Sequence, residues 1–166
     1  MKKNIAIVVL AIFSLILLQF TGQLYQDTRV YKSEIASYYE RLVTDTRRLV
    51  SRINNTNMEE ATKTEDGKKL LNNYREQILN SSFRFMNLQN ELYIIGEMLY
   101  DIGQLLHEAA EDSVSAKEVE EFEKQLEMVT LIIIDLQNHP DFPSYELFTE
   151  SNHELNEKIE QRLTEE

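Results

Sequence analysis

The sequence predicts an all-α protein: an N-terminal transmembrane helix followed by an antiparallel helical bundle with coiled-coil-like packing. The first observation is that only four glycines and two prolines occur among 166 residues. β-Hairpins and sandwiches need these residues at their turns, so we do not expect an all-β fold. The second is that apolar residues recur at steps of three and four along most of the chain, as on one face of a helix. The third is the absence of cysteine, which excludes a disulfide scaffold and a thiolate metal site.

The N-terminus has the pattern of a membrane anchor. Two lysines precede an apolar run over residues 5–20 that only Ser14 and Gln19 interrupt. A membrane-spanning helix needs about 20 residues, a length that residues 5–25 reach. Because the lysines favour the cytoplasmic side, we expect a cytoplasmic tail at 1–4, an anchor at 5–25 and an extracytoplasmic bundle at 26–166. The residues expected to form and orient the anchor are Lys2, Lys3, Ile5, Leu10, Phe13, Leu18, Phe20 and Tyr25.

A cleaved signal peptide is the alternative to an anchor, since its apolar core is also short and also follows lysines. Cleavage requires small residues at positions −3 and −1. The stretch Gln19-Phe20-Thr21-Gly22-Gln23 offers no such pair. We therefore favour an uncleaved single-pass anchor in the cytoplasmic membrane over secretion of a cleaved bundle.

Charge is distributed unevenly along the chain. Residues 1–107 carry 13 basic and 12 acidic side chains, a net charge of +1, whereas residues 108–166 carry 4 and 17, a net charge of −13. Such an acidic half repels phosphate backbones, so we expect no nucleic-acid partner. It is either a solvated helix surface, which we favour, or a surface for a cationic partner.

The first helix of the bundle is expected at about 24–55, continuous with the membrane helix because no strong breaker separates them. The polar residue Asp45 falls on its apolar stripe, where a buried side chain paired with Arg48 or Arg84 could fix the register. Residues 58–66 are polar and are expected to form a loop. The stripe itself consists of Tyr31, Ile35, Tyr38, Leu42 and Leu49.

The strongest pattern lies at 65–111, where apolar residues continue through six heptads and only Ser81 interrupts them. We expect one long central helix over this range. Gly96 and Gly103 lie one heptad apart within it. Since an interior glycine costs about 1 kcal/mol relative to alanine, the pair indicates close approach of another helix. The expected packing and interaction residues are Phe85, Leu92, Gly96, Leu99, Gly103 and Leu106.

Two shorter helices are expected at 115–138 and 142–164. Ser115 and Glu118 have capping-box spacing at the start of the first, with Val114 and Val119 at the staple positions. The second begins near Asp141 or Phe142, with Pro143 in its first turn. Polar Asn152 interrupts its apolar face, which is made of Phe148, Leu155, Ile159 and Leu163.

These lengths predict three long helices plus a fourth whose pattern is weaker. Helices 24–55 and 65–111 should form a long antiparallel pair, against which the other two fold as a shorter hairpin. The surplus length of the long pair would stand alone or be covered by a second copy of the chain.

No constellation of residues predicts catalysis, a cofactor or a bound metal. A Glu-x-x-His pattern occurs once, at Glu150 and His153, whereas a di-iron bundle needs two such motifs and two further glutamates. No phosphate-binding loop or nucleophile elbow is present. The chain is therefore expected not to be an enzyme.

An arginine cluster near the end of the first bundle helix has two interpretations. Arg47, Arg48 and Arg52, together with Arg41, could bind an anionic ligand. They could instead neutralise the acidic faces of the last two helices, the interpretation that we favour.

The layout resembles bacterial membrane-tethered helical ectodomains, including the four-helix sensor domains of chemoreceptors. We expect a cell-envelope protein that works as an adaptor, assembly factor or regulator through contacts with another protein or with a second copy of itself. The alternative is a sensor-like ectodomain with a small ligand between helices near Tyr38, Tyr39, Arg47 and Arg48. Because no second apolar run of membrane-spanning length follows, its signal would have to pass through a partner protein.

Overall fold

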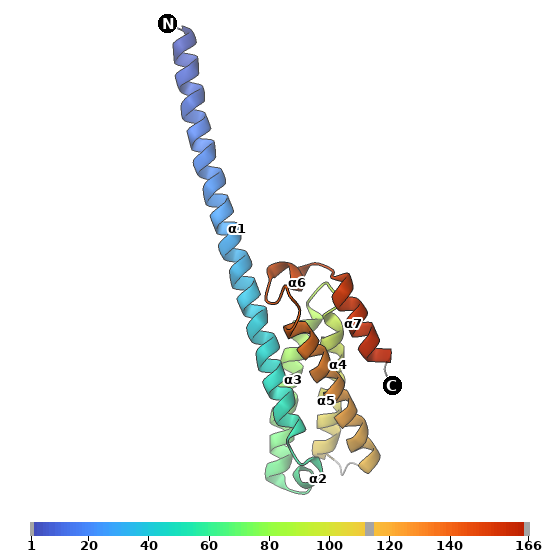
Figure 1. The fold of residues 1–166 in the computed structure, drawn as a ribbon. Helices are drawn as coiled ribbons and strands as arrows, with labels where there is room; N and C mark the ends of the chain where they lie inside the picture. Colours follow the sequence, from blue (N-terminus) through green and yellow to red (C-terminus); the bar gives the residue numbers. More distant parts are fainter. Residues whose placement is uncertain (1, 112–114, 165–166) are drawn as a thin grey trace.

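The computed structural model describes residues 2–111 and 115–164, and the side chains from residue 13 onward except that of Ala116. All regular structure in these ranges is helical, which confirms the all-α class. Figure 1 shows the helices as an elongated bundle with one helix projecting far beyond it. The elements are α1 (Lys2–Asn54), α2 (Met58–Ala61), α3 (Glu65–Met86), α4 (Tyr93–Glu111), α5 (Ala116–Gln137), α6 (Tyr145–Thr149) and α7 (His153–Thr164).

Helix α1 is continuous over 53 residues, which corresponds to a length of about 80 Å. Its C-terminal part forms one side of the bundle, and its N-terminal part stands alone (Figure 1). Gly22 lies in the projecting part, and a methyl group there would meet nothing within 4 Å among the described residues. The predicted continuity of the 24–55 helix with the preceding residues is therefore confirmed.

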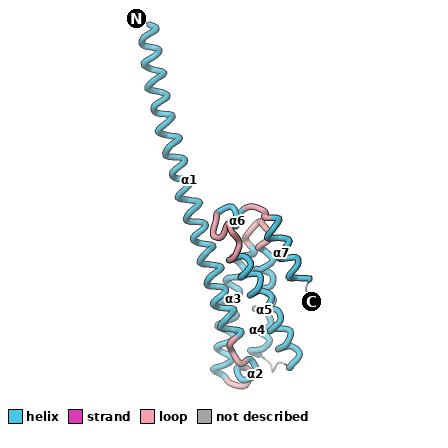
Figure 2. Tube along the Cα trace, in the orientation of Figure 1, coloured by secondary structure: helices cyan, strands magenta, loops and turns pink. Residues whose placement is uncertain are grey.

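The C-terminal part of α1, α3, α4 and α5 run alternately up and down around a common core, which confirms the antiparallel bundle (Figure 1). Helix α7 packs on α5, and α6 packs across α1. Figure 2 shows the loops gathered at the two ends of the bundle. The core is almost entirely aliphatic and aromatic, and its largest fully buried side chains are Ile53, Leu71, Ile78, Phe85, Leu92, Ile95, Leu99, Ile102, Leu106, Leu126, Ile132 and Phe148.

The single helix predicted at 65–111 is wrong, because the chain reverses between Met86 and Tyr93 and α4 folds back on α3. The reversal is held by Asn90, whose amide nitrogen donates to the carbonyls of Leu147 at 3.1 Å and Glu150 at 3.2 Å. Its side-chain oxygen also accepts from the Leu92 N–H. These hydrogen bonds satisfy the buried turn, so tertiary contacts override the helical pattern.

The fold-back also corrects the expected packing. Residues 65–111 form two helices, α3 and α4, that pack side by side, and not one long helix that pairs with 24–55. The predicted long pair of 24–55 with 65–111 is therefore wrong, as is the count of three long helices. Four helical segments of comparable length line the bundle, and no surplus pair extends beyond it (Figure 1).

The predicted close approach at the two glycines is confirmed, with α3 as the neighbour. A methyl group on Gly96 would lie 2.7 Å from the Met86 nitrogen and 2.8 Å from the Ser82 carbonyl oxygen. One on Gly103 would lie 2.8 Å from the Leu79 side chain. The Ser82 hydroxyl donates to the Gly96 carbonyl at 2.8 Å. The backbones of α3 and α4 thus meet where the sequence lacks side chains.

The segment predicted as a loop at 58–66 contains the four-residue helix α2. Asn57 caps it, since its side-chain oxygen accepts from the Glu60 N–H at 3.1 Å. Met58 and Ala61 are buried, and the backbone of Ala61 lies against Gly67. One helical turn is too short to produce a periodic pattern, so the sequence could not show it.

The start of α5 agrees with its prediction. The Glu118 N–H donates to the Ser115 hydroxyl at 3.3 Å, and the Ser115 N–H donates to the Glu118 carboxylate at 2.7 Å. The capping box is therefore confirmed. Val114, the expected staple residue, lies outside the described residues.

The predicted helix 142–164 is interrupted. Helix α6 begins after Ser144, which accepts from the Leu147 N–H at 3.2 Å, so Pro143 precedes the cap and does not occupy the first turn. The chain leaves the helical conformation between Thr149 and His153. The expected apolar face survives the break, because Phe148, Leu155 and Ile159 are buried and Leu163 packs against the core.

Replacing Gly96 by alanine should destabilise the bundle. The added methyl group meets backbone atoms that no side-chain rotation can move, and overpacking of this kind costs about 1–3 kcal/mol. Gly22→Ala is the matched control, since its methyl group meets open space and should change stability by no more than about 1 kcal/mol, in the stabilising direction. Urea unfolding of the full chain in detergent, followed by circular dichroism, measures both. Equal unfolding midpoints for the two variants would show that α3 and α4 do not pack at Gly96.

Candidate functional site

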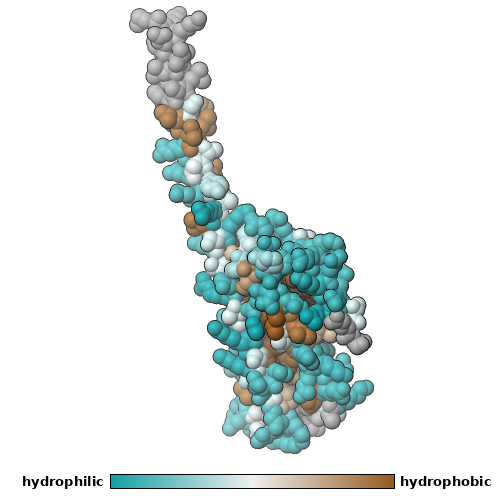
Figure 3. Space-filling model, viewed as in Figure 1, coloured by the Kyte–Doolittle hydropathy of each residue, from teal (hydrophilic) through white to brown (hydrophobic). Residues whose placement is uncertain are grey.

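The projecting part of α1 carries large apolar side chains that nothing covers. Of the expected anchor residues, Phe13, Leu18, Phe20 and Tyr25 are 60% to 73% exposed. Figure 3 shows this apolar surface on the part of α1 that stands clear of the bundle. The side chains of Lys2, Lys3, Ile5 and Leu10 lie outside the described residues. Among the residues that the structure describes, no helix offers a long enough apolar stretch to cross a membrane.

The joint between the projecting helix and the bundle is built on α6. Lys32 of α1 pairs with Glu146 at 2.6 Å, and the Tyr39 ring stacks on Phe148 with centroids 4.9 Å apart. The hydrogen bond from Lys32 holds the pKa of the Glu146 carboxyl below its usual range. The lysine is half exposed, so the ion pair itself stabilises little. Together these contacts set the direction in which α1 leaves the bundle.

A second junction ties the α3–α4 turn to the segment between α6 and α7. The Glu91 carboxylate accepts from the Ser151 hydroxyl and from the Asn152 N–H, the latter at 3.2 Å. Burial raises the pKa of Glu91, but the hydrogen bonds outweigh it and leave the pKa below its ordinary value of 4.5. Sequence reasoning missed this junction because its two sides lie 60 residues apart.

The structure places the expected packing residues in the interior. All of them are buried, at the α3–α4 contact or in the core that the bundle helices share. Exposed aromatic rings lie elsewhere on the same hairpin, at Phe83 with 55% exposure, Tyr93 with 46% and Tyr100 with 39%. The six interior residues are Phe85, Leu92, Gly96, Leu99, Gly103 and Leu106.

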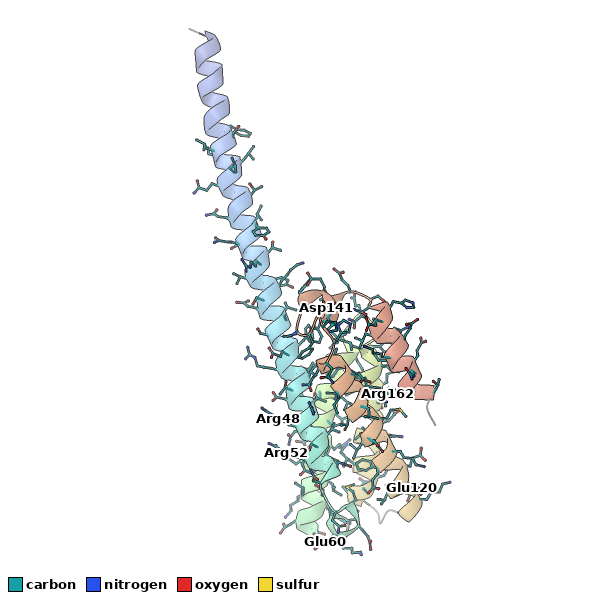
Figure 4. The ribbon with its side chains drawn as sticks, viewed as in Figure 1. Arg48, Arg52, Glu60, Glu120, Asp141 and Arg162 are labelled. Carbon is teal, nitrogen blue, oxygen red and sulfur yellow. The ribbon has the colours of Figure 1, made fainter. Side chains whose placement is uncertain are left out.

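Two arginines of the predicted cluster, Arg48 and Arg52, line an open groove between α1 and α3, which we call the arginine groove. Figure 4 labels Arg48 and Arg52 on the C-terminal part of α1. Both also border a second depression together with Arg47 and with Gln137 of α5. In the arginine groove, Arg84 of α3 joins them, although sequence reasoning considered it only as a partner for Asp45. The complete lining is Asp45, Arg48, Leu49, Arg52, Gln77, Asn80, Ser81 and Arg84.

The arginine groove is poor in counter-charges. Arg48 lies 3.5 Å from Asp45 in an exposed pair. Among the described residues, neither Arg52 nor Arg84 has a carboxylate within 4.0 Å. Arg47 points to the other side of α1, where it donates to the amide oxygen of Gln137 on α5 at 2.6 Å.

Among the described residues, the cluster forms no ion pair with the last two helices, and Arg47 donates instead to the neutral Gln137. One expectation about these residues is wrong. Asp45 is not a buried register residue, because its side chain is 73% exposed. Helix α1 turns Thr46 into the core instead, where it is fully buried.

The histidines and acidic residues do not converge. No three His, Asp or Glu side chains gather into a metal-binding group anywhere in the described ranges. Glu150 and His153 do not share a helix face, because α6 ends before the first and α7 begins at the second. His139 is buried and accepts from the Asp141 N–H through Nδ1 at 3.2 Å. The arrangement therefore offers surfaces for binding: an apolar helix, exposed aromatic rings and a cationic groove.

Comparisons with protein-family models, with curated proteins and with solved structures find nothing that matches this chain.

The junction at Glu91 should make stability depend on pH. Because folding lowers the pKa of this carboxyl, its stabilising contribution is complete above the ordinary value of 4.5 and is lost as pH falls through the lower folded-state pKa. Glu91→Gln should reduce stability at neutral pH and flatten its decline in acid. Glu97→Gln, an exposed residue of α4 without a hydrogen-bond partner in the described chain, is the control. Urea midpoints measured from about pH 7 to pH 3 test this. Parallel pH profiles for Glu91→Gln and the unmodified chain would contradict it.

Proposed function

We propose that this chain is a non-enzymatic, single-pass membrane protein whose helical bundle acts outside the cytoplasm as an adaptor, assembly factor or regulator. The observation that carries the proposal is the projecting half of α1. It is one unbroken helix, and its described apolar side chains, from Phe13 to Tyr25, are uncovered.

The uncovered side chains favour a lipid environment. Burying an apolar side chain of this size is worth about 1.5–3 kcal/mol, so leaving those between Phe13 and Tyr25 in water is unfavourable. A helix satisfies its own backbone hydrogen bonds and can enter the hydrocarbon without further partners. The flanking Lys2 and Lys3 support an orientation with the N-terminus inside. A secreted bundle released by cleavage is the competing outcome.

The part of α1 between the expected membrane boundary and the bundle would hold the bundle at a fixed distance from the membrane. Tyr25 to Tyr39 spans 14 residues, or about 20 Å of helix. The contacts of α6 with Lys32 and Tyr39 brace the lower part of this spacer. Such a stalk suits a protein that presents a surface to a neighbour at the membrane.

The outer face of the α3–α4 hairpin supports protein contacts as the mode of action. The interior is filled with apolar side chains. Phe83, Tyr93 and Tyr100 remain exposed at the surface, and aromatic residues of this kind are enriched at protein interfaces. The partner is another membrane or envelope protein or a second copy of this chain.

The arginine groove supports a second candidate function, a sensor-like ectodomain that binds a small ligand and signals through a partner protein. This groove lies between α1 and α3 and includes Arg48, but the expected Tyr39 is stacked on Phe148 and does not line it. The two functions are compatible, since an adaptor can be regulated by a ligand.

One experiment on isolated membranes tests the proposal with two measurements. The full chain should remain in the membrane fraction after an alkaline wash. The double variant Leu15→Arg/Leu18→Arg should be released into the soluble fraction, because each charge near the centre of a membrane helix costs about 2.5–3.5 kcal/mol. Thr28→Arg lies beyond the expected anchor and is the control. Release of the unmodified chain into the soluble fraction would contradict the anchor.

The second measurement places a photo-crosslinking residue at Tyr100, on the exposed aromatic face, or at Glu120, on the acidic face of α5. We expect a discrete heavier adduct with a different protein from the first position and none from the second. Adducts of the chain with itself alone would count against the adaptor and in favour of a homodimer.

A further inference from the structure

We propose that the arginine groove is a binding site for a phosphomonoester, a ligand class that carries a dianionic phosphate group. Two helices build the site. Arg48 and Arg52 are one turn apart on α1, and Arg84 faces them from α3. The α3 wall also presents Gln77, Asn80 and Ser81, whose spacing of three and four puts them on the same helix face as Arg84.

Charge gives the first argument. Three arginines line this groove and Asp45 is the one carboxylate in its lining, so the groove carries a net charge of about +2. The chain has 29 acidic residues and a net charge of −12, yet in the described structure none pairs with Arg52 or Arg84. Like charges held side by side repel each other until an anion enters. A phosphomonoester, with a charge of about −1.5 to −2 at pH 7, matches the excess.

Shape gives the second argument. Guanidinium groups bind phosphate and carboxylate oxygens through paired N–H donors. Here the lining arginines come from two helices, Arg48 and Arg52 from α1 and Arg84 from α3. A tetrahedral phosphate presents three terminal oxygens in different directions, whereas a carboxylate presents two in one plane. The floor at Leu49 is buried and apolar, which strengthens the electrostatic attraction above it.

The position of the groove favours phosphate on a soluble molecule over phosphate of a lipid headgroup. This inference rests on the proposed membrane orientation. Arg48 lies 23 residues beyond Tyr25 on the same helix, or about 35 Å from the expected membrane boundary. Lipid headgroups are therefore out of reach. The ligand comes from the aqueous side, as a free phosphomonoester or one carried on a larger soluble molecule.

Titration calorimetry of the full chain in phosphatidylcholine nanodiscs, with glycerol 3-phosphate as the probe, tests the site. We expect saturable binding that weakens about tenfold or more for each arginine removed in Arg52→Gln/Arg84→Gln, because each loses charge-assisted hydrogen bonds. Arg29→Gln/Lys69→Gln removes the same charge from outside the groove and should bind like the unmodified chain. Dimethyl phosphate and acetate, each a monoanion, should bind more weakly than the probe.

Three results would overturn the proposal: no saturable binding, equal weakening in both double variants, or equal affinity for acetate and the probe. Replacing phosphatidylcholine by phosphatidylglycerol should leave the affinity unchanged. Loss of binding in those discs would identify lipid phosphate as the occupant and refute the soluble source. If the chain does not enter nanodiscs, the same titration in buffer still decides the site, so failure of the anchor and failure of the groove are distinguishable.

Discussion

Asn90 joins two segments that lie 57 to 60 residues apart in the sequence, and the bundle depends on this buried amide. Its donor hydrogens bind the carbonyls of Leu147 and Glu150, and its oxygen receives the Leu92 N–H. An unsatisfied polar group at this depth would cost about 1–3 kcal/mol. Because all three bonds form, the chain can reverse with the Asn90 side chain buried. The reversal brings α4 onto α3, and the core that they share then receives α1 and α5.

The same reversal explains how the C-terminal segment is placed. Glu91, next to Asn90, holds Ser151 and the Asn152 N–H. Helix α6 is thereby set against α1, where Glu146 and Phe148 meet Lys32 and Tyr39. The direction of the stalk thus follows from hydrogen bonds at the turn.

Helical periodicity correctly predicted the class of the fold and most of its buried positions. Leu71, Ile78, Leu99 and Leu106 lie on the predicted stripe and are fully buried. The stripe could not distinguish one helix from two, because both halves of 65–111 face one core and the turn contains neither glycine nor proline. The capping box at Ser115 was predictable because both of its partners are local. Asn90 was not, since its acceptors lie 57 and 60 residues away.

In the candidate binding surfaces, too, local features were predictable from the sequence and contacts between distant residues were not. Arg48 and Arg52 stand out in the sequence because they share one helix face. The contribution of Arg84 required the packing of α3 on α1, and the lack of counter-charges required the whole fold. The structure thus combines a projecting helix with exposed apolar side chains, contacts of α6 that hold this helix against the bundle, and a cationic groove on an acidic protein. These features fit the proposed membrane-anchored adaptor, regulated by an anion that binds its outer face.

The fold-back at Asn90 can be measured directly, because the chain contains no cysteine and single labels can be placed at introduced cysteines. Spin labels at Glu76→Cys and Asp101→Cys report the distance across the hairpin by pulsed electron resonance. Neighbouring helix axes lie about 8–10 Å apart, so the account predicts a narrow distribution below about 25 Å between labels. In one continuous helix the two labelled positions, 25 residues apart, would be separated by about 37 Å. A single peak near that longer distance would contradict the account.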